Sequence, residues 1–353
     1  MMDCDFAHMS MGDFMKNLEQ EAYEQAIPVK GIFELTPRCN MNCQMCYVHL
    51  QPDQIPAVGR ELTAEEWIAI GRAARDAGMV ELTLTGGEAL VRPDFREIYE
   101  AFSEMGFLIQ LYTNGYGLNE KIMEWLKERP PYSIRFTMYG FSDETYEKVC
   151  GVKHGFTRVI EAMNLVRRSG IPMYMVATIT KDNEQDFPSI EAFAKENGLP
   201  FTYTTALIPP VRGAVADVER YQVERRMPPP EVLEEMRRPE NRKKPHKRHE
   251  NLLEVCGNYR KGFWITWNGK MQLCTFLTEP GEPVLEYGFQ ESWNRLLQDV
   301  QKLRQPEKCL DCRYEGYCSR CYGELYAASG RCDAAAESCC EHARLMYEIY
   351  ETE

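Results

Sequence analysis

Residues 39–47 read Cys39-Asn40-Met41-Asn42-Cys43-Gln44-Met45-Cys46-Tyr47 and hold three cysteines in the spacing C-x3-C-x2-C. A strand-like run, residues 31–36, leads into them, and Pro37 ends that run. The thiols are therefore presented from a loop at the end of a strand. Three closely spaced thiolates favour a soft metal centre. Two centres fit this spacing: a zinc ion with His49 as its fourth ligand, and an iron–sulfur cluster with one iron left open.

Length and composition bound the class of protein. The chain has 353 residues, of which 44% are apolar, so it can build a sizeable core, and a single α/β barrel can reach this length. The formal net charge is −13, with 54 acidic against 41 basic residues. This acidic balance argues against general nucleic-acid binding, which needs a basic surface.

The cysteines are distributed unevenly along the chain. Of the 14, only Cys150 lies strictly between residues 47 and 255, whereas nine lie in the last hundred residues. Disulfide scaffolds are usually short and secreted, and this chain is long. Its first residues have neither the basic region nor the apolar run of a signal peptide, and no segment is apolar enough to span a membrane. We therefore expect a cytoplasmic protein whose cysteines bind metal.

Strand-like and helix-like segments alternate from residue 31 onward. The capping box Thr63-Ala64-Glu65-Glu66 predicts the start of one of the helices. The predicted strands are residues 31–36, 79–85, 107–113, 134–139, 173–180 and 201–207, and the predicted helices are residues 64–77, 94–105, 119–128, 143–169 with a break near Gly151 and Gly155, and 186–197. Such alternation indicates parallel βαβ units, and six of them make an α/β fold, a partial (β/α)6 barrel of the TIM type.

Polar motifs follow three successive strands of this barrel. The cysteine loop follows the first strand, Gly86-Gly87-Glu88 the second, and Asn114-Gly115 the third. Ligands of such folds bind at the carboxyl ends of the strands. The three motifs are therefore predicted to share one site.

The chain changes character after residue 208. Met227-Pro228-Pro229-Pro230 predicts a stiff break without helix, and residues 237–248 carry seven basic side chains. This basic run is either a solvated linker or a patch for an acidic peptide substrate. Residues 263–267 and 270–274, joined by Asn268-Gly269, predict a β-hairpin.

The C-x3-C-x2-C loop with Tyr47 directly after it, and Gly86-Gly87-Glu88 after the next strand, resemble the radical S-adenosylmethionine (radical SAM) superfamily over roughly residues 30–207. The resemblance implies that Cys39, Cys43 and Cys46 ligate three irons of a [4Fe–4S] cluster, whose fourth iron binds the methionine end of SAM. Reductive cleavage of SAM then yields a 5′-deoxyadenosyl radical that abstracts hydrogen from the substrate. His49 is not needed as a ligand, because the fourth position stays open.

The resemblance also implies the residues that contact SAM. They are Tyr47, Gly86, Gly87, Glu88, Thr113, Asn114, Thr137 and Thr178. Glu88 accepts from the ammonium group, the two glycines permit close backbone approach, and Tyr47 packs near the adenine. The sequence departs from the family at Ala89, where proline is common, and at Val149-Cys150, near the usual place of an arginine that binds the SAM carboxylate.

The C-terminal cysteines resemble the SPASM extension of this superfamily, which carries two auxiliary [4Fe–4S] clusters. The matching spacing is Cys256, then Gly269-x4-Cys274, then Cys309-x2-Cys312-x5-Cys318-x2-Cys321. The resemblance implies Cys256, Cys274 and Cys321 at the first cluster and Cys309, Cys312 and Cys318 at the second. The fourth ligands lie among Cys332, Cys339 and Cys340. We expect Cys339 at the second cluster, which leaves Cys332, Cys340 or an open iron for the first.

The predicted parts of the chain are an N-terminal helical extension (1–30), the radical SAM partial barrel (31–208), a basic, proline-containing linker (209–255) and a SPASM auxiliary-cluster domain (256–353). The N-terminal part includes a short amphipathic helix at residues 13–25 and is too short for a separate peptide-binding domain.

SPASM enzymes commonly modify peptides and proteins. The resemblance therefore implies a radical SAM oxidoreductase that matures a ribosomally made peptide, with a thioether or other side-chain crosslink as the favoured product. Oxidation of a sulfatase-type protein is one alternative, weakened because Thr275 stands where that branch has an aspartate. Oxidation of a small molecule and a non-enzymatic zinc scaffold or electron-transfer protein are the others. The expected partners are a peptide or protein substrate and an external flavodoxin- or ferredoxin-type electron donor, with no nucleic acid and no membrane.

Overall fold

The computed structural model describes residues 11–224, 227–228 and 230–351. Its centre is one nine-stranded sheet in the order β6-β5-β4-β3-β2-β1-β7-β8-β9. The first six strands are parallel and neighbour one another in chain order: β1 (Lys30–Glu34), β2 (Glu81–Thr85), β3 (Leu108–Thr113), β4 (Ser133–Met138), β5 (Met173–Thr178) and β6 (Phe201–Thr204). The predicted parallel α/β fold is confirmed.

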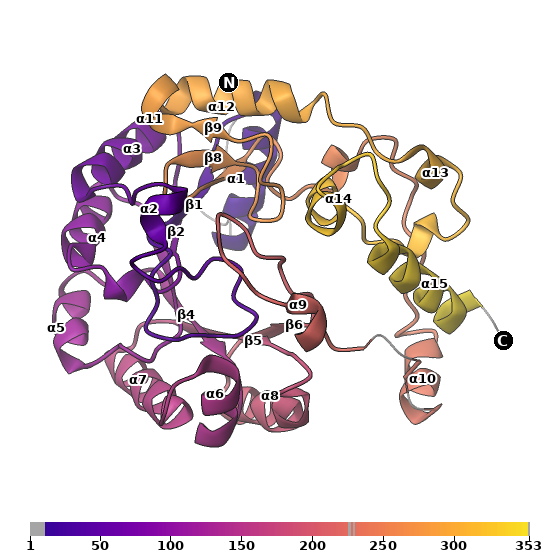
Figure 1. Cartoon of the computed structure of the whole chain (residues 1–353), viewed down its shortest axis with the longest axis horizontal. Helices are drawn as coiled ribbons and strands as arrows, with labels where there is room; N and C mark the ends of the chain where they lie inside the picture. Colours follow the sequence, from indigo (N-terminus) through magenta and orange to yellow (C-terminus); the bar gives the residue numbers. More distant parts are fainter. Residues whose placement is uncertain (1–10, 225–226, 229, 352–353) are drawn as a thin grey trace.

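Helices follow each of the first five strands and lie in an arc on the outer face of the sheet (Figure 1). They are α3 (Ala64–Asp76), α4 (Phe95–Glu104), α5 (Glu120–Glu128), α6 (Asp143–Cys150), α7 (Gly155–Ser169) and α8 (Phe187–Glu196), whereas the short α2 (Ile55–Val58) lies inside this arc, near β1. The predicted break near Gly151 separates α6 from α7, and Gly151 adopts the left-handed conformation that ends α6.

Alternation along each strand separates the core from the interior of the barrel. Phe33 of β1 is fully buried toward the helices, where its ring stacks on Trp67 of α3 at 5.2 Å and meets Phe102 of α4 at 5.5 Å. The next residue, Glu34, points to the opposite face because successive side chains of a strand alternate. Along β4, the same alternation places Arg135 and Thr137 on the face opposite the buried Ile134 and Phe136.

The C-terminal region continues the same sheet. The predicted hairpin forms as β7 (Gly262–Ile265) and β8 (Lys270–Gln272), and a short β9 (Glu282–Pro283) follows. β7 pairs in parallel with β1, in a register that sets Lys30 opposite Gly262. The sequence predicts this hairpin but not the strand to which it is joined.

Most of the remaining C-terminal elements form a lobe at one side of the barrel (Figure 1). Those of the lobe are α13 (Glu307–Leu310), η5 (Glu315–Tyr317), α14 (Tyr322–Ser329) and α15 (Glu337–Glu351), whereas α11 (Val284–Tyr287) and α12 (Phe289–Val300) lie over the barrel beside β8 and β9. α12 lies on the sheet, where Phe289 and Trp293 pack on Phe263 of β7. Trp293 also donates to the carbonyl of Ala26, just after the N-terminal helix α1 (Met11–Gln25), at 2.8 Å.

The segment between barrel and lobe is partly helical. It contains α9 (Val218–Tyr221), α10 (Pro230–Arg237) and η4 (Leu252–Val255). α10 begins at the last proline of the predicted break and packs on α15. Pro229, and residues 1–10 of the predicted N-terminal extension, lie outside the described residues. The domain boundaries drawn from the sequence stay predictions.

Within the part of the chain that the structure describes, no helix is long and apolar enough to cross a membrane.

The capping box at the start of α3 gives a direct test of this local structure. Thr63 accepts from the Glu66 amide at 3.2 Å, and Glu66 accepts from the Thr63 amide at 2.9 Å. We expect Thr63→Ala to lower the free energy of unfolding by about 1 kcal/mol, because the first turn of α3 loses its cap. Urea denaturation of the apoprotein measures this loss. Thr63→Ser keeps the hydroxyl and should stay near the wild type, and equal losses in both variants would contradict the capping role.

Candidate active site

The cysteine loop is held against the turn that follows β2. The Gly87 amide donates to the Thr36 carbonyl at 2.7 Å, and the Glu88 amide donates to the Arg38 carbonyl at 2.9 Å. A Cβ atom on Gly87 would lie 2.4 Å from the Arg38 carbonyl oxygen. The expected close approach at these glycines is therefore made by the backbone that carries Cys39.

Glu88 connects this turn to the end of β3. Its buried carboxylate accepts from the Thr113 hydroxyl at 2.9 Å, the Asn114 amide at 2.8 Å and the Leu90 amide at 3.1 Å. Asn114 in turn directs its side-chain amide at the Cys39 sulfur, at 3.4 Å. Burial raises the pKa of Glu88, although these hydrogen bonds oppose the rise. Three of about four acceptor positions are filled, so one is left for a cationic donor.

The C-terminal end of α6 supports the loop from the other side. Asn42 donates to the Cys150 carbonyl at 2.8 Å, and Gln44 donates to the Val149 carbonyl at 3.2 Å. The buried Cys150 thiol lies beside Cys43 and is the first cause of its raised pKa. Val149-Cys150, where an arginine is usual in the family, therefore serves as a backbone clamp on the cysteine loop.

The three cysteines of the loop are half-buried and lie close to one another. Burial, followed by the neighbouring Cys43 thiol, raises the pKa of Cys46 to about 11, and burial raises the pKa of Cys39 further. Without a metal these groups are protonated at neutral pH, so binding a metal centre must displace their protons. Three converging soft ligands beside a carboxylate with a free acceptor position fit an iron–sulfur cluster with an attached aminoacyl ligand.

The remaining predicted cofactor residues occupy different positions. Thr137 and Thr178 lie at or near the carboxyl ends of β4 and β5, half-buried on the opposite face from the fully buried Phe136 and Met138. Tyr47 lies toward the β7–β8 hairpin, since its neighbours include Trp267 and Thr275. The structure thus joins Thr113 and Asn114 directly to Glu88 and Cys39. It leaves the cofactor contacts of Thr137, Thr178 and Tyr47 as predictions.

A buried ion pair spans the mouth of the barrel. Arg212, in the loop after β6, donates through Nη2 to Glu34 at 2.7 Å, and the two side chains are 7% and 0% exposed. Arg212 Nε and Nη1 and Glu34 Oε1 have no hydrogen-bond partner among the described residues. Burial raises the pKa of Glu34, while Arg212 and the Trp267 backbone lower it. An acidic residue inside an apolar strand was a visible signal for Glu34, but the sequence contained none for Arg212.

One group of C-terminal thiols gathers around the hairpin and α14. Cys274 and Cys321 flank Gly323, where a Cβ atom would lie 3.2 and 3.6 Å from their sulfurs. Burial raises the pKa of Cys332 to about 11, and the Cys274 thiol contributes to that rise. The Cys256 thiol likewise contributes to the raised pKa of Cys274. Cys332 thus lies near Cys274, one of the three cysteines expected at the first auxiliary cluster, and its role as a ligand stays a prediction.

A second group of thiols lines a cavity of about 160 Å³ between α13, η5 and α15. Its cysteines are Cys309, Cys312, Cys318, Cys339 and Cys340. The Cys340 thiol contributes to the raised pKa of Cys309, and the Cys318 thiol contributes to the raised pKa of Cys340. Cys339 and Cys340 therefore both lie at the site expected for the second cluster. Among the described residues, no three cysteine, histidine or carboxylate side chains converge tightly enough for a single metal ion.

The sequence of residues 33–211 matches the Radical SAM superfamily, which is half of the chain. The chain belongs to the radical SAM superfamily. Its cofactors are accordingly a [4Fe–4S] cluster and SAM, and it is an enzyme of the radical SAM type. The cysteine spacing of the C-terminal region resembles the SPASM extension of that superfamily.

Several known proteins are similar to this radical SAM protein. The AdoMet-dependent heme synthase of Methanosarcina barkeri is 27% identical over 84% of this chain and 92% of its own. The PqqA peptide cyclase of Gluconobacter oxydans is 28% identical, over 48% of this chain and 47% of its own. Among solved structures, SuiB of Streptococcus suis bound to S-adenosylmethionine has a TM-score of 0.66 at 16% identity, covering 94% of this chain and 84% of SuiB. The structure of anSMEcpe with bound AdoMet has a TM-score of 0.61 at 15% identity, covering 91% and 93%. These structures share the fold.

The contact between Gly87 and the cysteine loop predicts the effect of substituting Gly87 on cluster binding. In Gly87→Ala the new methyl group meets the Arg38 carbonyl, so the loop must move, at a cost of about 1–3 kcal/mol. We expect the anaerobically reconstituted variant to contain less iron than the wild type, by the amount that one cluster holds. Gly59→Ala is the matched control, because its Cβ atom has only ordinary contacts, at 3.5 Å. Wild-type iron content in Gly87→Ala would contradict this role of the turn.

The buried ion pair predicts a pH-dependent loss of stability. Arg212→Met leaves the Glu34 carboxyl uncompensated, which should lower the free energy of unfolding by about 3–5 kcal/mol at neutral pH. The loss of Arg212 raises the folded-state pKa of Glu34 further above its unfolded value. The free energy of unfolding of the variant therefore falls as pH rises from the unfolded-state pKa of Glu34 to its folded-state pKa. The loss of stability relative to the wild type should be smaller at pH 5 than at pH 8.

Urea denaturation at both pH values measures this deficit. Glu34→Leu combined with Arg212→Met removes both charges and should recover most of the loss. A double variant as unstable as Arg212→Met would show that the pair is not the cause.

Proposed function

We propose that this radical SAM enzyme modifies a ribosomally made peptide, with a thioether or other side-chain crosslink as the favoured product. The observation that carries the proposal is an open cavity of about 570 Å³ between the barrel and the C-terminal lobe. Its walls come from residues 208–212 after β6, residues 268–279 around β8, and residues 326–330 at the end of α14.

The chemistry of this cavity suits a segment of polypeptide. Pro209, Pro210 and Phe276 supply apolar surface, and Lys270 and Glu279 at its wall form an ion pair at 2.7 Å. Arg212 lines the cavity, and its side chain runs inward to the buried Glu34. Apolar walls with a few placed polar groups are typical of binding sites. An extended peptide held here has one end at the barrel mouth and the other beside the cysteine-rich lobe.

The residues of the barrel hold the cofactors that start the reaction. We propose Cys39, Cys43 and Cys46 as the cluster ligands and Glu88 as the acceptor for the SAM ammonium group. When bound, the cluster and SAM supply the abstraction of a hydrogen atom from the substrate. Glu88 and Asn114 keep the Cys39 side of the loop in place through the bonds described above. Thr137, Thr178 and Tyr47 remain proposed SAM contacts.

The thiols of the lobe support an electron-accepting role for the auxiliary clusters. We propose Cys256, Cys274, Cys321 and Cys332 at the first site, and Cys309, Cys312 and Cys318 with Cys339 or Cys340 at the second. Four protein ligands at the first site leave no iron open for a substrate thiolate. Forming a crosslink removes electrons from the substrate, and fully ligated clusters can accept them.

A second candidate function is a reaction on a small molecule. It is favoured by the AdoMet-dependent heme synthase of M. barkeri, whose alignment extends over 84% of this chain, against 48% for the G. oxydans peptide cyclase. In that case the cavity beside Arg212 holds a haem precursor in place of a peptide.

The cluster also needs electrons from outside. We propose an external donor of the flavodoxin or ferredoxin type and a cytoplasmic location. All thirteen cysteines among the described residues are free thiols, which supports a reducing compartment.

Two assays test the proposal in order. Anaerobic protein given SAM and a chemical reductant should release 5′-deoxyadenosine, and Cys43→Ala should abolish that release because the cluster loses a ligand. A peptide encoded beside this gene should then lose two hydrogen atoms per crosslink by mass spectrometry, only when SAM is present. Conversion of a haem precursor with no change in the peptide would establish the second candidate. Undiminished 5′-deoxyadenosine release by Cys43→Ala would remove the cluster assignment.

A further inference from the structure

We propose that Arg320, supported by the basic segment 246–249, is a fixed positive charge that raises the reduction potential of the cluster held by Cys309, Cys312 and Cys318. The inference rests on the proposed function only in requiring that this site binds a [4Fe–4S] cluster. It gives a role to part of the basic run that the sequence left as either a linker or a substrate patch.

Arg320 is the buried cation of this site. It lines the cavity together with the cysteines, and its side chain is 4% exposed. Its guanidinium donates to Gln305 at 2.9 Å and faces the Cys318 thiol, with Cys309 nearby. Its Nε atom has no hydrogen-bond partner among the described residues. The neutral side-chain amide of Gln305 thus holds one part of the guanidinium, and another part faces the thiols.

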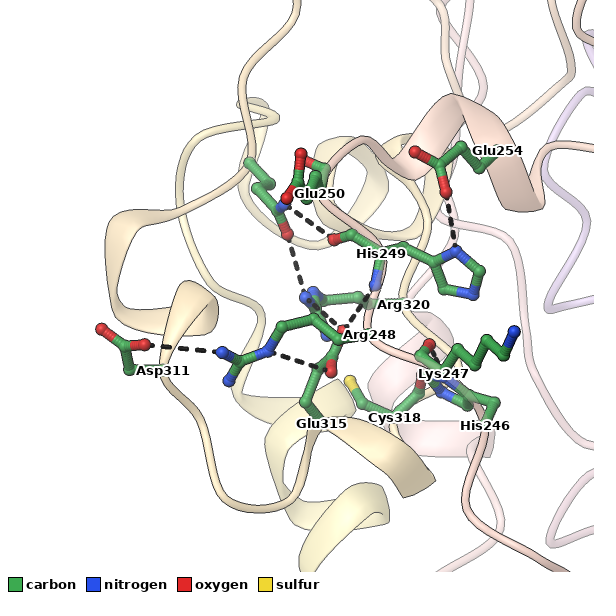
Figure 2. A network of polar contacts seen from close by, with 11 residues as sticks. His246, Lys247, Arg248, His249, Glu250, Glu254, Asp311, Glu315, Cys318 and Arg320 are labelled. Carbon is green, nitrogen blue, oxygen red and sulfur yellow. Dashed lines mark hydrogen bonds and ion pairs between the residues drawn. The ribbon is translucent and has the colours of Figure 1, made fainter.

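Glu315 does not fully neutralise the charge of Arg320, because the Glu315 carboxylate also pairs with Arg248. Its buried carboxylate lies 3.5 Å from Arg320 and 3.4 Å from Arg248, and it also accepts from the His249 amide at 3.2 Å. Figure 2 shows both arginines directed at the Glu315 carboxylate. One carboxylate shared by two guanidinium groups cannot neutralise both of them. The exposed Asp311 pairs with Arg248 at 3.5 Å on the side away from Arg320.

The basic segment is anchored on the turn that carries Cys318. The His246 amide donates to the Gly316 carbonyl at 2.9 Å, and its ring nitrogen Nε2 lies 2.9 Å from the Cys318 carbonyl (Figure 2). Earlier in the run, Arg237 donates to the Ile349 carbonyl of α15 at 2.6 Å. These contacts fix Arg248 in place against Glu315, so this part of the run is not a solvated linker.

The electrostatic consequence has a definite sign. Adding an electron makes an iron–sulfur cluster more negative, and a fixed cation in a poorly solvated site stabilises that form. Arg320 therefore favours the reduced cluster. A more easily reduced cluster is a better acceptor for the electrons that the proposed peptide oxidation removes.

The test measures the midpoint potential of this cluster in the full-length, anaerobically reconstituted protein. Cys39, Cys43 and Cys46 are replaced by Ala in the background, so that only the auxiliary clusters remain. The signal of the second site is the one lost in Cys312→Ala. We expect Arg320→Gln to lower the midpoint potential of this cluster by about 59 mV for a one-electron reduction. At a fixed potential, the ratio of reduced to oxidised cluster then falls about tenfold. Arg320→Lys should restore most of the wild-type value.

Arg344→Gln is the matched control. Arg344 lines the same cavity, but it is 49% exposed and pairs with Glu337 at 3.0 Å, so its removal should change the potential little. A shift in Arg344→Gln equal to that in Arg320→Gln would overturn the inference, and so would an unchanged potential in Arg320→Gln with full iron content.

If Arg320→Gln does not bind the second cluster, the midpoint potential of that cluster in Arg248→Gln tests the inference instead. Without Arg248, Glu315 neutralises Arg320 more fully, so the potential should fall in the same direction by a smaller amount. No shift in that variant would overturn the inference. Absence of any cluster from this site in the parent protein would overturn both this inference and the proposed second auxiliary site, whereas a cluster with unchanged potentials would overturn this inference alone.

Discussion

The backbone contact between the turn after β2 and the cysteine loop after β1 is the constraint on which the rest of the site depends. Two amide-to-carbonyl bonds, at 2.7 and 2.9 Å, join residues 87 and 88 to residues 36 and 38. Only glycine fits at Gly87, because any Cβ atom would overlap the Arg38 carbonyl. The same turn carries Glu88, which reaches the end of β3 and, through Asn114, the Cys39 sulfur. Three strand ends thereby become one rigid site.

A second constraint brings the cysteine-rich lobe to that site. β7 pairs with β1, the strand that leads into the cysteine loop, so the hairpin before Cys274 is part of the barrel sheet. The Glu34–Arg212 pair then links β1 to the loop after β6 on the open side of the barrel. The proposed substrate cavity lies between these two connections. Its lining includes Arg212, which reaches Glu34 of β1, and Gln272 and Phe276, which lie on either side of Cys274 in the sequence.

Much of the local structure was predictable because it depends on neighbours in sequence. The capping box of α3, the break between α6 and α7, and the hairpin at Asn268-Gly269 all form as expected. Other features were not predictable. The basic run looked like a solvated linker, yet Arg237, His246 and Arg248 contact residues that lie far along the chain. Composition cannot show such contacts, since a basic side chain looks the same whether it is solvated or docked.

The sequence by itself determined the family, the alternating order of strands and helices, and the cluster of three thiols at residues 39–46, because cysteine spacing and strand periodicity are properties of short stretches. Only the tertiary structure decided which distant groups meet. It sorted Cys332 with Cys274 and placed Cys339 and Cys340 at the other cavity. It also paired Glu34 with Arg212 across a separation of 178 residues. Such pairings depend on how the sheet curves and where the lobe docks, and no local pattern encodes either one.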